Sequence, residues 1–320
     1  MPSDVRTFFV SMIHVILLTA AIITITFLGI RPDPDHYFAG SLLHTRLLGN
    51  TPSPRIILAG GSNVSFGIDA ELMQRKLGIP VINDGLHAGL GLAPLRELEE
   101  YIRDGDVIII SLEYNLFAYQ DVLNGDPTFL SDWIEYSPRR IQYLSKPWEE
   151  TPGIYAIMLQ RKVNRQVNTV LFGGSLNQVR DIFVGTKYDL NGDFIGHLQE
   201  TSMNRRKIPA TPYPVSGLQD DIFVFLENFN RIAQEKGATV YFEAPASRQS
   251  NCKATGQAQM ADFFKTFAER SSIPILTPLD EVCLPNKYFF DTEYHLNAQG
   301  RELRTERLIK DWIRVTAASK

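Results

Sequence analysis

A serine, an aspartate and a histidine occur in this sequence in settings that suit nucleophilic catalysis. Ser62 lies in ILAGGSNVSFGI, where an apolar run is followed by a glycine-rich turn and then by a helical pattern. A hydroxyl in such a turn is exposed near a helix N-terminus, whose free amides can stabilise an oxyanion. Asp291 and His295 lie in DTEYHLN, just ahead of the last helical pattern. An imidazole is the usual general base for a serine hydroxyl, and a carboxylate orients it, so this set favours acyl-transfer chemistry.

Two further segments contain groups that could stabilise an oxyanion. VINDGLHAGLGL contains Gly85 and Gly89, whose backbone can approach a ligand closely. IIISLEYN ends at Asn115, whose side-chain amide can donate to developing negative charge. The alternative for Gly85, Gly89 and Asn115 is that they are ordinary turn residues, and the alternative for Ser62 is that it caps a helix. A dinucleotide site is disfavoured, because GLGL lacks the third glycine of that motif.

Most of these residues follow apolar runs that read as strands. Unbroken β-branched runs are typical of strands covered on both faces, and strands that alternate with helices favour right-handed crossovers and a parallel sheet. The sequence therefore predicts an α/β fold of three layers, with helices on both sides of the sheet. The expected strands cover 55–60, 80–83, 106–114, 238–244 and 273–276, and the expected helices cover 70–77, 95–103, 219–236, 257–270 and 297–315.

Residues 116–216 interrupt this alternation. A stretch of about a hundred residues is too long for a simple connection, and loops of that size usually carry function or structure of their own. We expect helices over 137–144 and 154–171. We interpret the stretch as an insert that covers the carboxyl edge of the sheet, where ligands bind in such folds.

Together, these segments resemble the SGNH or GDSL-type hydrolase superfamily. That family has a serine after its first strand, a glycine and an asparagine in the next two blocks, and an aspartate with a histidine near the end. The resemblance covers residues 55–315 and implies an α/β/α sandwich with a flavodoxin-like parallel sheet. It assigns the catalytic roles to Ser62, His295 and Asp291, and the oxyanion hole to Gly89 or Gly85 together with Asn115.

Three features of the sequence depart from the family pattern. Gly61 stands where the family usually has the aspartate of its first block, and Glu113 stands where the third block usually has a glycine. Three residues separate Asp291 from His295, where two are usual. Glu293 is therefore a second candidate for the carboxylate that orients the imidazole.

The beginning of the chain has a different character. Phe8 to Ile30 is a run of 23 residues without Asp, Glu, Lys or Arg, and about 20 apolar residues span the core of a bilayer. A cleavable signal peptide usually has a shorter apolar region that ends at a small-residue site, which FLGIRPDPD does not offer. We expect an uncleaved anchor over 1–30, a proline-rich linker over 31–54 and a catalytic domain over 55–320.

The two cysteines bear on the side of the membrane that the domain occupies. Arg6 and Arg31 flank the apolar run on its two sides, so charge leaves the orientation open. Cys252 and Cys283 lie about thirty residues apart, and a disulfide between them would favour an oxidising compartment such as the periplasm or the cell exterior. Two unrelated buried thiols are the alternative.

The composition indicates a globular chain and gives no sign of nucleic-acid binding. With 44% hydrophobic residues, 21% charged residues and a net charge of -4, most of the chain should fold in water and has no overall attraction to nucleic acid. Membrane-anchored SGNH domains resemble accessory proteins of envelope polysaccharide and teichoic-acid acylation, which work beside a multispanning acyltransferase. The resemblance therefore implies a serine esterase or O-acyltransferase that acts on acyl, most simply acetyl, esters of a cell-envelope glycan.

The alternative is a non-catalytic scaffold or carbohydrate-binding subunit with the same fold. Two basic clusters of the insert are candidates for contact with an anionic glycan, although a solvated charged face is the simpler explanation for each. They are Arg161-Lys162 with Arg165, and Arg205-Arg206-Lys207. Acyl transfer through a serine, a histidine and an aspartate requires no cofactor and no metal.

Overall fold

A parallel sheet of four strands lies at the centre of the structure, a computed structural model that describes residues 3–29, 31–118, 123–172, 182–199 and 209–318. The strands lie in the order β2-β1-β3-β4, and every neighbouring pair is parallel. Each corresponds to an apolar run of the sequence, so the fold is α/β, as predicted. The strand bounds are β1 (Ile56–Gly60), β2 (Val81–Asn83), β3 (Val107–Ser111) and β4 (Thr239–Phe242).

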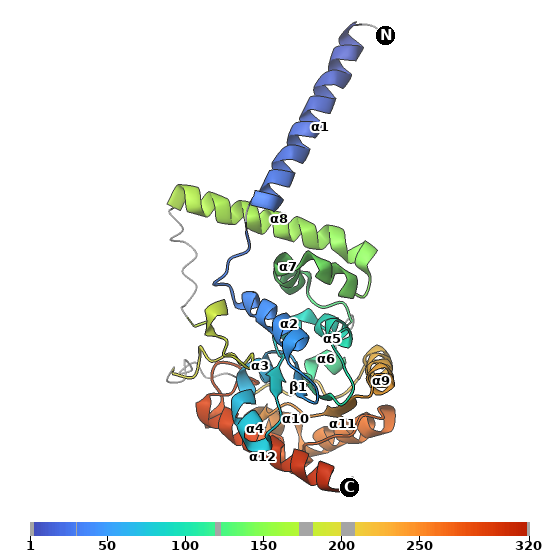
Figure 1. Cartoon of the computed structure of the whole chain (residues 1–320), viewed down its shortest axis with the longest axis vertical. Helices are drawn as coiled ribbons and strands as arrows, with labels where there is room; N and C mark the ends of the chain where they lie inside the picture. Colours follow the sequence, from blue (N-terminus) through green and yellow to red (C-terminus); the bar gives the residue numbers. More distant parts are fainter. Residues whose placement is uncertain (1–2, 30, 119–122, 173–181, 200–208, 319–320) are drawn as a thin grey trace.

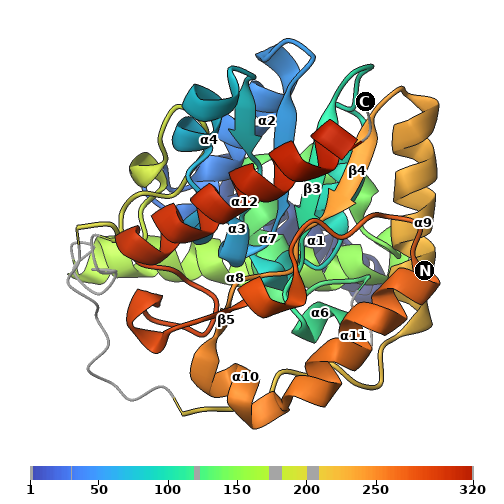
Figure 2. The same cartoon turned by 90° about the horizontal axis from the view of Figure 1, so that it is seen from below.

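Helices pack on both faces of this sheet because its side chains point alternately to either side. On one face, Ile56 and Leu58 of β1 share a core with α4 (Ala70–Leu77) and α12 (Ala298–Ala318). Figure 2 shows α12 crossing that face of the strands. On the other face, Ile57 and Ala59 share a core with α5 (Ala93–Glu99), α9 (Asp220–Glu235) and α11 (Gln257–Arg270).

Local capping explains why some elements end where the sequence predicts. The helices expected over 70–77 and 257–270 have these bounds in α4 and α11. Asp69 caps α4 by accepting the amide of Leu72 at 2.9 Å, and Gly78 ends it with a φ of 69° that favours glycine. The strand expected over 273–276 is wrong as a strand of the sheet, because Ile275 makes only an isolated parallel bridge with Phe242.

Helix α1 (Ser3–Gly29) extends away from the rest of the structure (Figure 1). Apolar side chains between Val5 and Leu18 are exposed. By length and mean hydropathy, none of the helices in the part of the chain that the structure describes qualifies as a membrane span.

The chain that follows α1 is folded, contrary to the linker that its prolines predict over 31–54. It forms the 3-10 helix η1 (Tyr37–Ala39) and helix α2 (Gly40–Asn50). Tyr37 and Phe38 are buried, and the hydroxyl of Tyr37 donates to the carbonyl of Leu86 at 2.7 Å. These aromatic side chains attach the segment to the α/β core, so the folded body begins at η1 rather than at Arg55.

The insert expected over 116–216 is largely helical in its described parts. Helices α7 and α8 pack against each other, and Trp133, Ile134, Ile154 and Met158 form a core there. This core also includes Phe66 of the α/β domain, so the insert is attached to the end of the sheet. Its elements are α6 (Asn115–Ala118), α7 (Pro127–Tyr136), η3 (Pro138–Tyr143), α8 (Pro147–Phe172) and η5 (Gly185–Lys187).

The first basic cluster of the insert is not a freely solvated face, and its contact with a glycan stays a prediction. Arg161 pairs with Asp132, and both Lys162 and Arg165 pair with Glu135, so α8 directs these cations toward the carboxylates of α7. The second cluster, Arg205-Arg206-Lys207, lies outside the described residues.

Cys252 and Cys283 form a disulfide with their Cα atoms 6.3 Å apart, so the alternative of two unrelated thiols is wrong. The bond joins α10 (Gln249–Thr255) to β6 (Cys283–Leu284), which pairs in parallel with β5 (Ser247–Arg248). Two 3-10 helices, η6 (Leu279–Glu281) and η7 (Asn286–Tyr288), flank β6 and lead toward α12.

Candidate active site

Ser62 is the first residue of the short helix α3 (Ser62–Gly67), which follows β1 after one residue. The two glycines before it are required by close packing against the end of β3. A Cβ at Gly60 would lie 2.1 Å from the carbonyl oxygen of Ser111, and a Cβ at Gly61 would lie 2.5 Å from the carboxylate of Glu113. The Gly-Gly-Ser turn thus brings the half-buried Ser62 to the carboxyl edge of the sheet, as the sequence predicts.

The segment between η7 and α12 brings Asp291 and His295 together. Oδ1 of Asp291 lies 2.7 Å from Nδ1 of His295, and both side chains are partly buried. The hydroxyl of Thr292 accepts the amide of His295 at 3.0 Å, which shapes the turn between the pair. Glu293 makes no hydrogen bond or ion pair with His295 within the described part of the chain, so Asp291 is the partner of the imidazole. A proton on Nδ1, donated to Asp291, leaves Nε2 as the basic nitrogen.

Ser62, Asp291 and His295 line one cavity of about 260 Å³. Within the described residues no hydrogen bond joins Ser62 to His295. The cavity wall is mainly aromatic and combines the α/β core with the segment before β1 and the insert. The other lining residues are His36, Tyr37, Phe38, Phe66, His87, Phe129, Asp132 and Phe183.

The ring of Phe66 holds the imidazole of His295 from one side. The two rings are stacked with centroids 4.1 Å apart and an interplanar angle of 7°. Phe66 is also 4.8 Å from the buried ring of His197, a residue of the insert. Burial lowers the pKa of His197 to about 3, and the positive charge of Arg301 acts in the same direction, so His197 is neutral near pH 7.

The loop after β2 does not provide the oxyanion donor expected from Gly89. The amide of Gly89 donates to Nδ1 of His87 at 3.0 Å, within the 3-10 helix η2 (Ala88–Leu90). Burial lowers the pKa of His87 to about 4, so this ring is neutral and able to accept that bond. The alternative, Gly85, donates its amide to Oδ1 of Asn83 at 2.9 Å. Both amides therefore already have acceptors.

The remaining oxyanion candidates are the amide of Ser62 and the side chain of Asn115. The Ser62 amide has no hydrogen bond to another described residue and lies at the N-terminus of α3, as an anion donor requires. Asn115 begins α6 beyond the end of β3, and its Oδ1 is buried without a hydrogen-bond partner among the described residues. Asn115 is not one of the residues that line the 260 Å³ cavity.

Glu113 lies directly beneath the serine turn. It is buried and accepts the amide of Asn63 on Oε1 at 3.1 Å, while its Oε2 has no partner among the described residues. Burial raises the pKa of this carboxyl group. Its carboxylate, two residues beyond the end of β3, occupies the space that a side chain at position 61 would need. This one contact accounts for both Gly61 and Glu113, two of the differences from the SGNH pattern that the sequence resembles.

A buried cation from the last helix supports the same turn. Arg304 of α12 donates to the carbonyl of Asn63 at 2.6 Å, to the hydroxyl of Ser111 at 2.9 Å and to Glu243 at 2.8 Å. Through these contacts, Arg304 joins the segments that follow β1 and β4 to the last residue of β3, behind Ser62. The sequence predicts a helix with apolar and basic residues here, but residue spacing alone does not indicate that Arg304 is buried.

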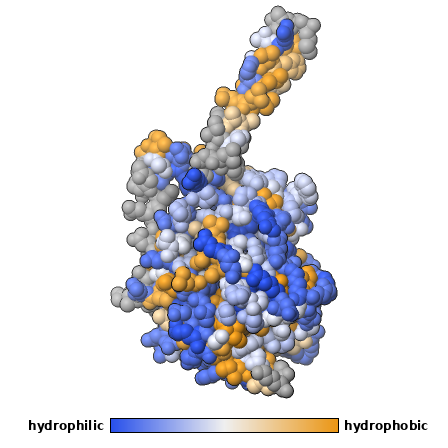
Figure 3. Space-filling view, in the orientation of Figure 1, coloured by the Kyte–Doolittle hydropathy of each residue, from blue (hydrophilic) through white to orange (hydrophobic). Residues whose placement is uncertain are grey.

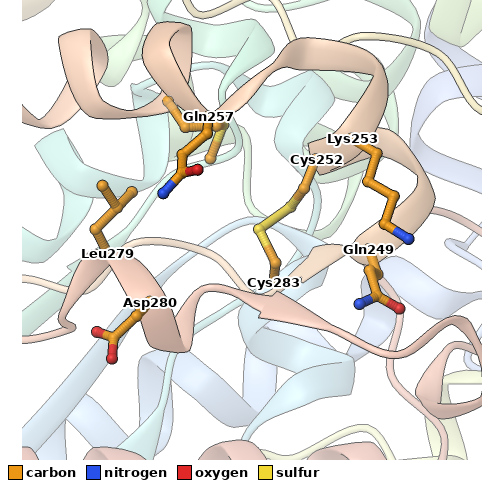
Figure 4. Close-up of a pocket in the computed structure, with 8 residues that line it drawn as sticks. Gln249, Cys252, Lys253, Gln257, Leu279, Asp280 and Cys283 are labelled. Atoms are coloured by element: carbon orange, nitrogen blue, oxygen red, sulfur yellow. A yellow bond between two sulfur atoms is a disulfide. The ribbon is translucent and has the colours of Figure 1, made fainter.

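A larger cavity of about 630 Å³ lies beside the disulfide, away from this site (Figure 4). It shares no lining residue with the Ser62 cavity and contains no histidine. Lys253 and Asp280 are its charged lining residues, and Figure 4 shows them on either side of the bond between Cys252 and Cys283. Its side chains therefore lack the nucleophile and base that the Ser62 cavity contains.

Neither models of known protein families nor curated proteins match this sequence. The chemistry of the site has to be argued from its own residues.

Proposed function

We propose that this protein is an SGNH-type serine esterase or O-acyltransferase that uses Ser62, His295 and Asp291. The 2.7 Å contact between Asp291 and His295, made on the same cavity as Ser62, carries the proposal. An accessible serine, an imidazole that acts as its base and a carboxylate that orients the imidazole are the three parts that serine acyl transfer needs. The parallel sheet with helices on both faces is compatible with the SGNH-like, flavodoxin-like fold that the sequence resembles.

In the proposed reaction, Oγ of Ser62 attacks the carbonyl carbon of an ester while Nε2 of His295 takes its proton. Asp291 accepts a hydrogen bond from Nδ1–H, without taking the proton, and stabilises the imidazolium that forms. The imidazolium then protonates the departing alcohol, which leaves an acyl group on Ser62. Water or the hydroxyl of an acceptor attacks this acyl-enzyme, again with His295 as the base, and restores the free serine.

The oxyanion would be held by the amide of Ser62, with the side chain of Asn115 as second donor. Loss of one such donor in other enzymes costs about 3 kcal/mol of transition-state stabilisation. Gly89 has no part in this scheme unless its bond to His87 breaks on substrate binding.

The size and lining of the cavity support a short acyl group. Its volume of about 260 Å³ is below the range of about 300 to 1,000 Å³ that is common for drug-sized ligands. Phe38, Phe66 and Phe129 provide apolar contacts for an acetyl methyl group. An acetyl ester of a larger molecule, such as a cell-envelope glycan, could place its acyl group here while the remainder lies outside.

The proposed setting is the outer face of the cytoplasmic membrane, with α1 as a single-pass anchor. This part of the proposal is supported by the charge-free run over 8–30, by the exposed apolar side chains of α1 and by the disulfide, which persists in oxidising compartments such as the periplasm. A multispanning acyltransferase is the proposed partner in polysaccharide modification.

Hydrolysis of a chromogenic acetyl ester by the full chain tests the chemistry. Ser62→Ala should abolish the hydrolysis, whereas Ser65→Ala, in the same helix but buried and outside the cavity, should retain it. Adding an excess of an oligosaccharide acceptor separates the two enzyme classes. A transferase should form the acylated sugar at the expense of free acid, while an esterase should release acid at an unchanged rate.

A non-catalytic scaffold is the second candidate. It is favoured by two observations, the commitment of the Gly89 amide to His87 and the lack of a Ser62 to His295 hydrogen bond within the described residues. If ester hydrolysis is absent in the wild type, or equal in wild type and Ser62→Ala, the scaffold explains the site better than the enzyme does.

A further inference from the structure

Helix α8 occupies a distinctive place beside the proposed anchor. It lies across the foot of α1, and its other side rests on α7 (Figure 1). Ile154 and Met158 are buried on the side that faces α7. One long face of α8 is therefore turned away from the body of the protein, on the side from which α1 departs.

Beyond its first turn, the charged residues of α8 are all directed to the inner side. Between Thr151 and Leu171 the sequence contains three charged residues, Arg161, Lys162 and Arg165. Each of them pairs with Asp132 or Glu135 of α7. A helix face in water usually carries charged side chains, so their complete absence from the outward face over this stretch requires another explanation.

The outward face of α8 presents four exposed apolar side chains, beside the uncharged and also exposed Gln160, Asn164 and Gln166. The exposed fractions are 43% for Val163, 45% for Val167, 69% for Val170 and 67% for Leu171. Their spacing of four, three and one residues places them on one side of a helix, opposite Ile154 and Met158. Figure 3 shows hydrophobic residues at the upper left of the body, over this end of α8, and again along α1.

We infer that α8 lies flat on the lipid bilayer that α1 enters, with Val163, Val167, Val170 and Leu171 immersed among the lipids. The inference rests on the proposed role of α1 as an anchor. A helix with one apolar and one polar face is the type that lies in the membrane interface. Here the cations of the polar face are paired with α7, so adhesion should depend on apolar contact and not on anionic lipids.

This placement would fix the height of the active site above the membrane. Helix α7 packs on α8 with one side, and its residues Phe129 and Asp132 line the cavity of Ser62. Packed helices lie about 8 to 10 Å apart, so the cavity would be about two helix diameters from the lipid surface. The substrate of the proposed reaction would be an ester held close to the membrane, as in a lipid-linked or newly exported glycan.

Fluorescence quenching in vesicles tests the inference with the full chain. Cys252 and Cys283 are paired, so a single introduced cysteine can be labelled with an environment-sensitive fluorophore. The three positions are Leu17→Cys in α1, Val170→Cys in α8 and Val224→Cys in α9, and the proteins are reconstituted in vesicles whose acyl chains carry a quencher. Val224 is the matched control, because it is a helical valine with the same 69% exposure as Val170 and lies on a helix distant from α8 (Figure 1).

We expect several-fold stronger quenching at positions 17 and 170 than at 224. The quenching at 170 should be equal in zwitterionic and anionic vesicles and insensitive to salt. If the fluorophore at position 17 is quenched but the one at 170 is quenched no more than the one at 224, the inference is overturned and the anchor stays intact. Quenching at 170 only with anionic lipid would contradict the apolar mechanism. Failure of the chain to float with vesicles, with no quenching at 17, would overturn both the anchor and this inference.

Discussion

The ring of Phe66 lies parallel to the imidazole of His295, with 4.1 Å between their centroids. Phe66 is four residues after Ser62, so nucleophile and ring project from one side of α3. The short helix that presents the proposed nucleophile therefore also positions the proposed base. This explains how a histidine more than two hundred residues away in the sequence is held at the same cavity.

Replacing Phe66 should misalign His295 without removing any reacting group. An aromatic pair contributes about 0.5 to 1.5 kcal/mol beyond its buried area, and about 1.4 kcal/mol corresponds to a factor of ten in rate. We expect Phe66→Leu to lower kcat up to about tenfold. Phe183→Leu changes the same cavity, but among the described residues Phe183 forms no ring stack with His295, so this variant should act mainly on KM. Equal kcat in both variants would show that the stacking does not position the base.

Neutralising Asp291 should affect catalysis far more than neutralising its neighbour. Asp291→Asn would present an amide to Nδ1 and favour the wrong tautomer of His295, a change that costs on the order of 10⁴-fold in kcat in a well-studied triad. Glu293→Gln should retain activity, because Asp291 is the carboxylate that contacts the imidazole. Steady-state kinetics of both variants check this prediction. A larger loss of kcat in Glu293→Gln than in Asp291→Asn would mean that Glu293 orients His295.

Introducing an aspartate at position 61, where the SGNH pattern that the sequence resembles has one, should destabilise this protein. In Gly61→Asp the new Cβ would lie 2.5 Å from the buried carboxylate of Glu113, which is held by the amide of Asn63. Such overpacking typically costs about 1 to 3 kcal/mol of stability. Gly49→Asp is the control, since a Cβ there meets no described atom within 4 Å.

The double variant Gly61→Asp with Glu113→Gly tests whether the carboxylate has moved between the two positions. It should be more stable and more active than Gly61→Asp, which thermal unfolding and ester hydrolysis can measure. A double variant that is worse than either single variant would mean that Glu113 and position 61 do not share one space.

The contribution of two buried histidines to stability should fall as the pH decreases from about 6.5 to about 4. Burial lowers the pKa of His197 to about 3 and that of His44 to about 4, from 6.5 in the unfolded chain. The unfolded state then binds more protons in this range, so the free energy of unfolding decreases with falling pH. One pKa unit corresponds to about 1.4 kcal/mol, and each buried histidine therefore costs several kcal/mol once the unfolded chain is fully protonated.

His197→Phe separates this effect from the titration of carboxylates. Urea unfolding at about pH 7 and about pH 5 should show a smaller loss of stability in the variant than in the wild type, because one of the titrating groups is gone. An equal loss in both proteins would mean that His197 is not buried as a neutral ring.

The sequence predicted features that depend on local chemistry. The bounds of α4 follow from Asp69 and Gly78, and the position of Ser62 follows from an apolar run that ends in a glycine turn. The pairing of Cys252 with Cys283 and the meeting of Asp291 with His295 also agree with the sequence.

Features that depend on distant partners could not be predicted in this way. The cations of α8 look solvent-facing by spacing, but carboxylates of α7 hold them inward. The glycine of the second block looks available, but a histidine two residues earlier accepts its amide. Tyr37 belongs to the cavity although prolines near it indicate a linker, and the aromatic residues of that stretch were the available signal.

Covalent labelling of Ser62 tests the central claim most directly. The full chain is treated with a serine-directed phosphonate, and the modified residue is identified by mass spectrometry in the wild type, in His295→Ala and in Ser62→Ala. Because an activated serine requires its base, we predict one phosphonate on Ser62 in the wild type, strongly reduced labelling in His295→Ala and none in Ser62→Ala. Labelling of another residue, or equal labelling of Ser62 with and without His295, would contradict the proposed catalytic site.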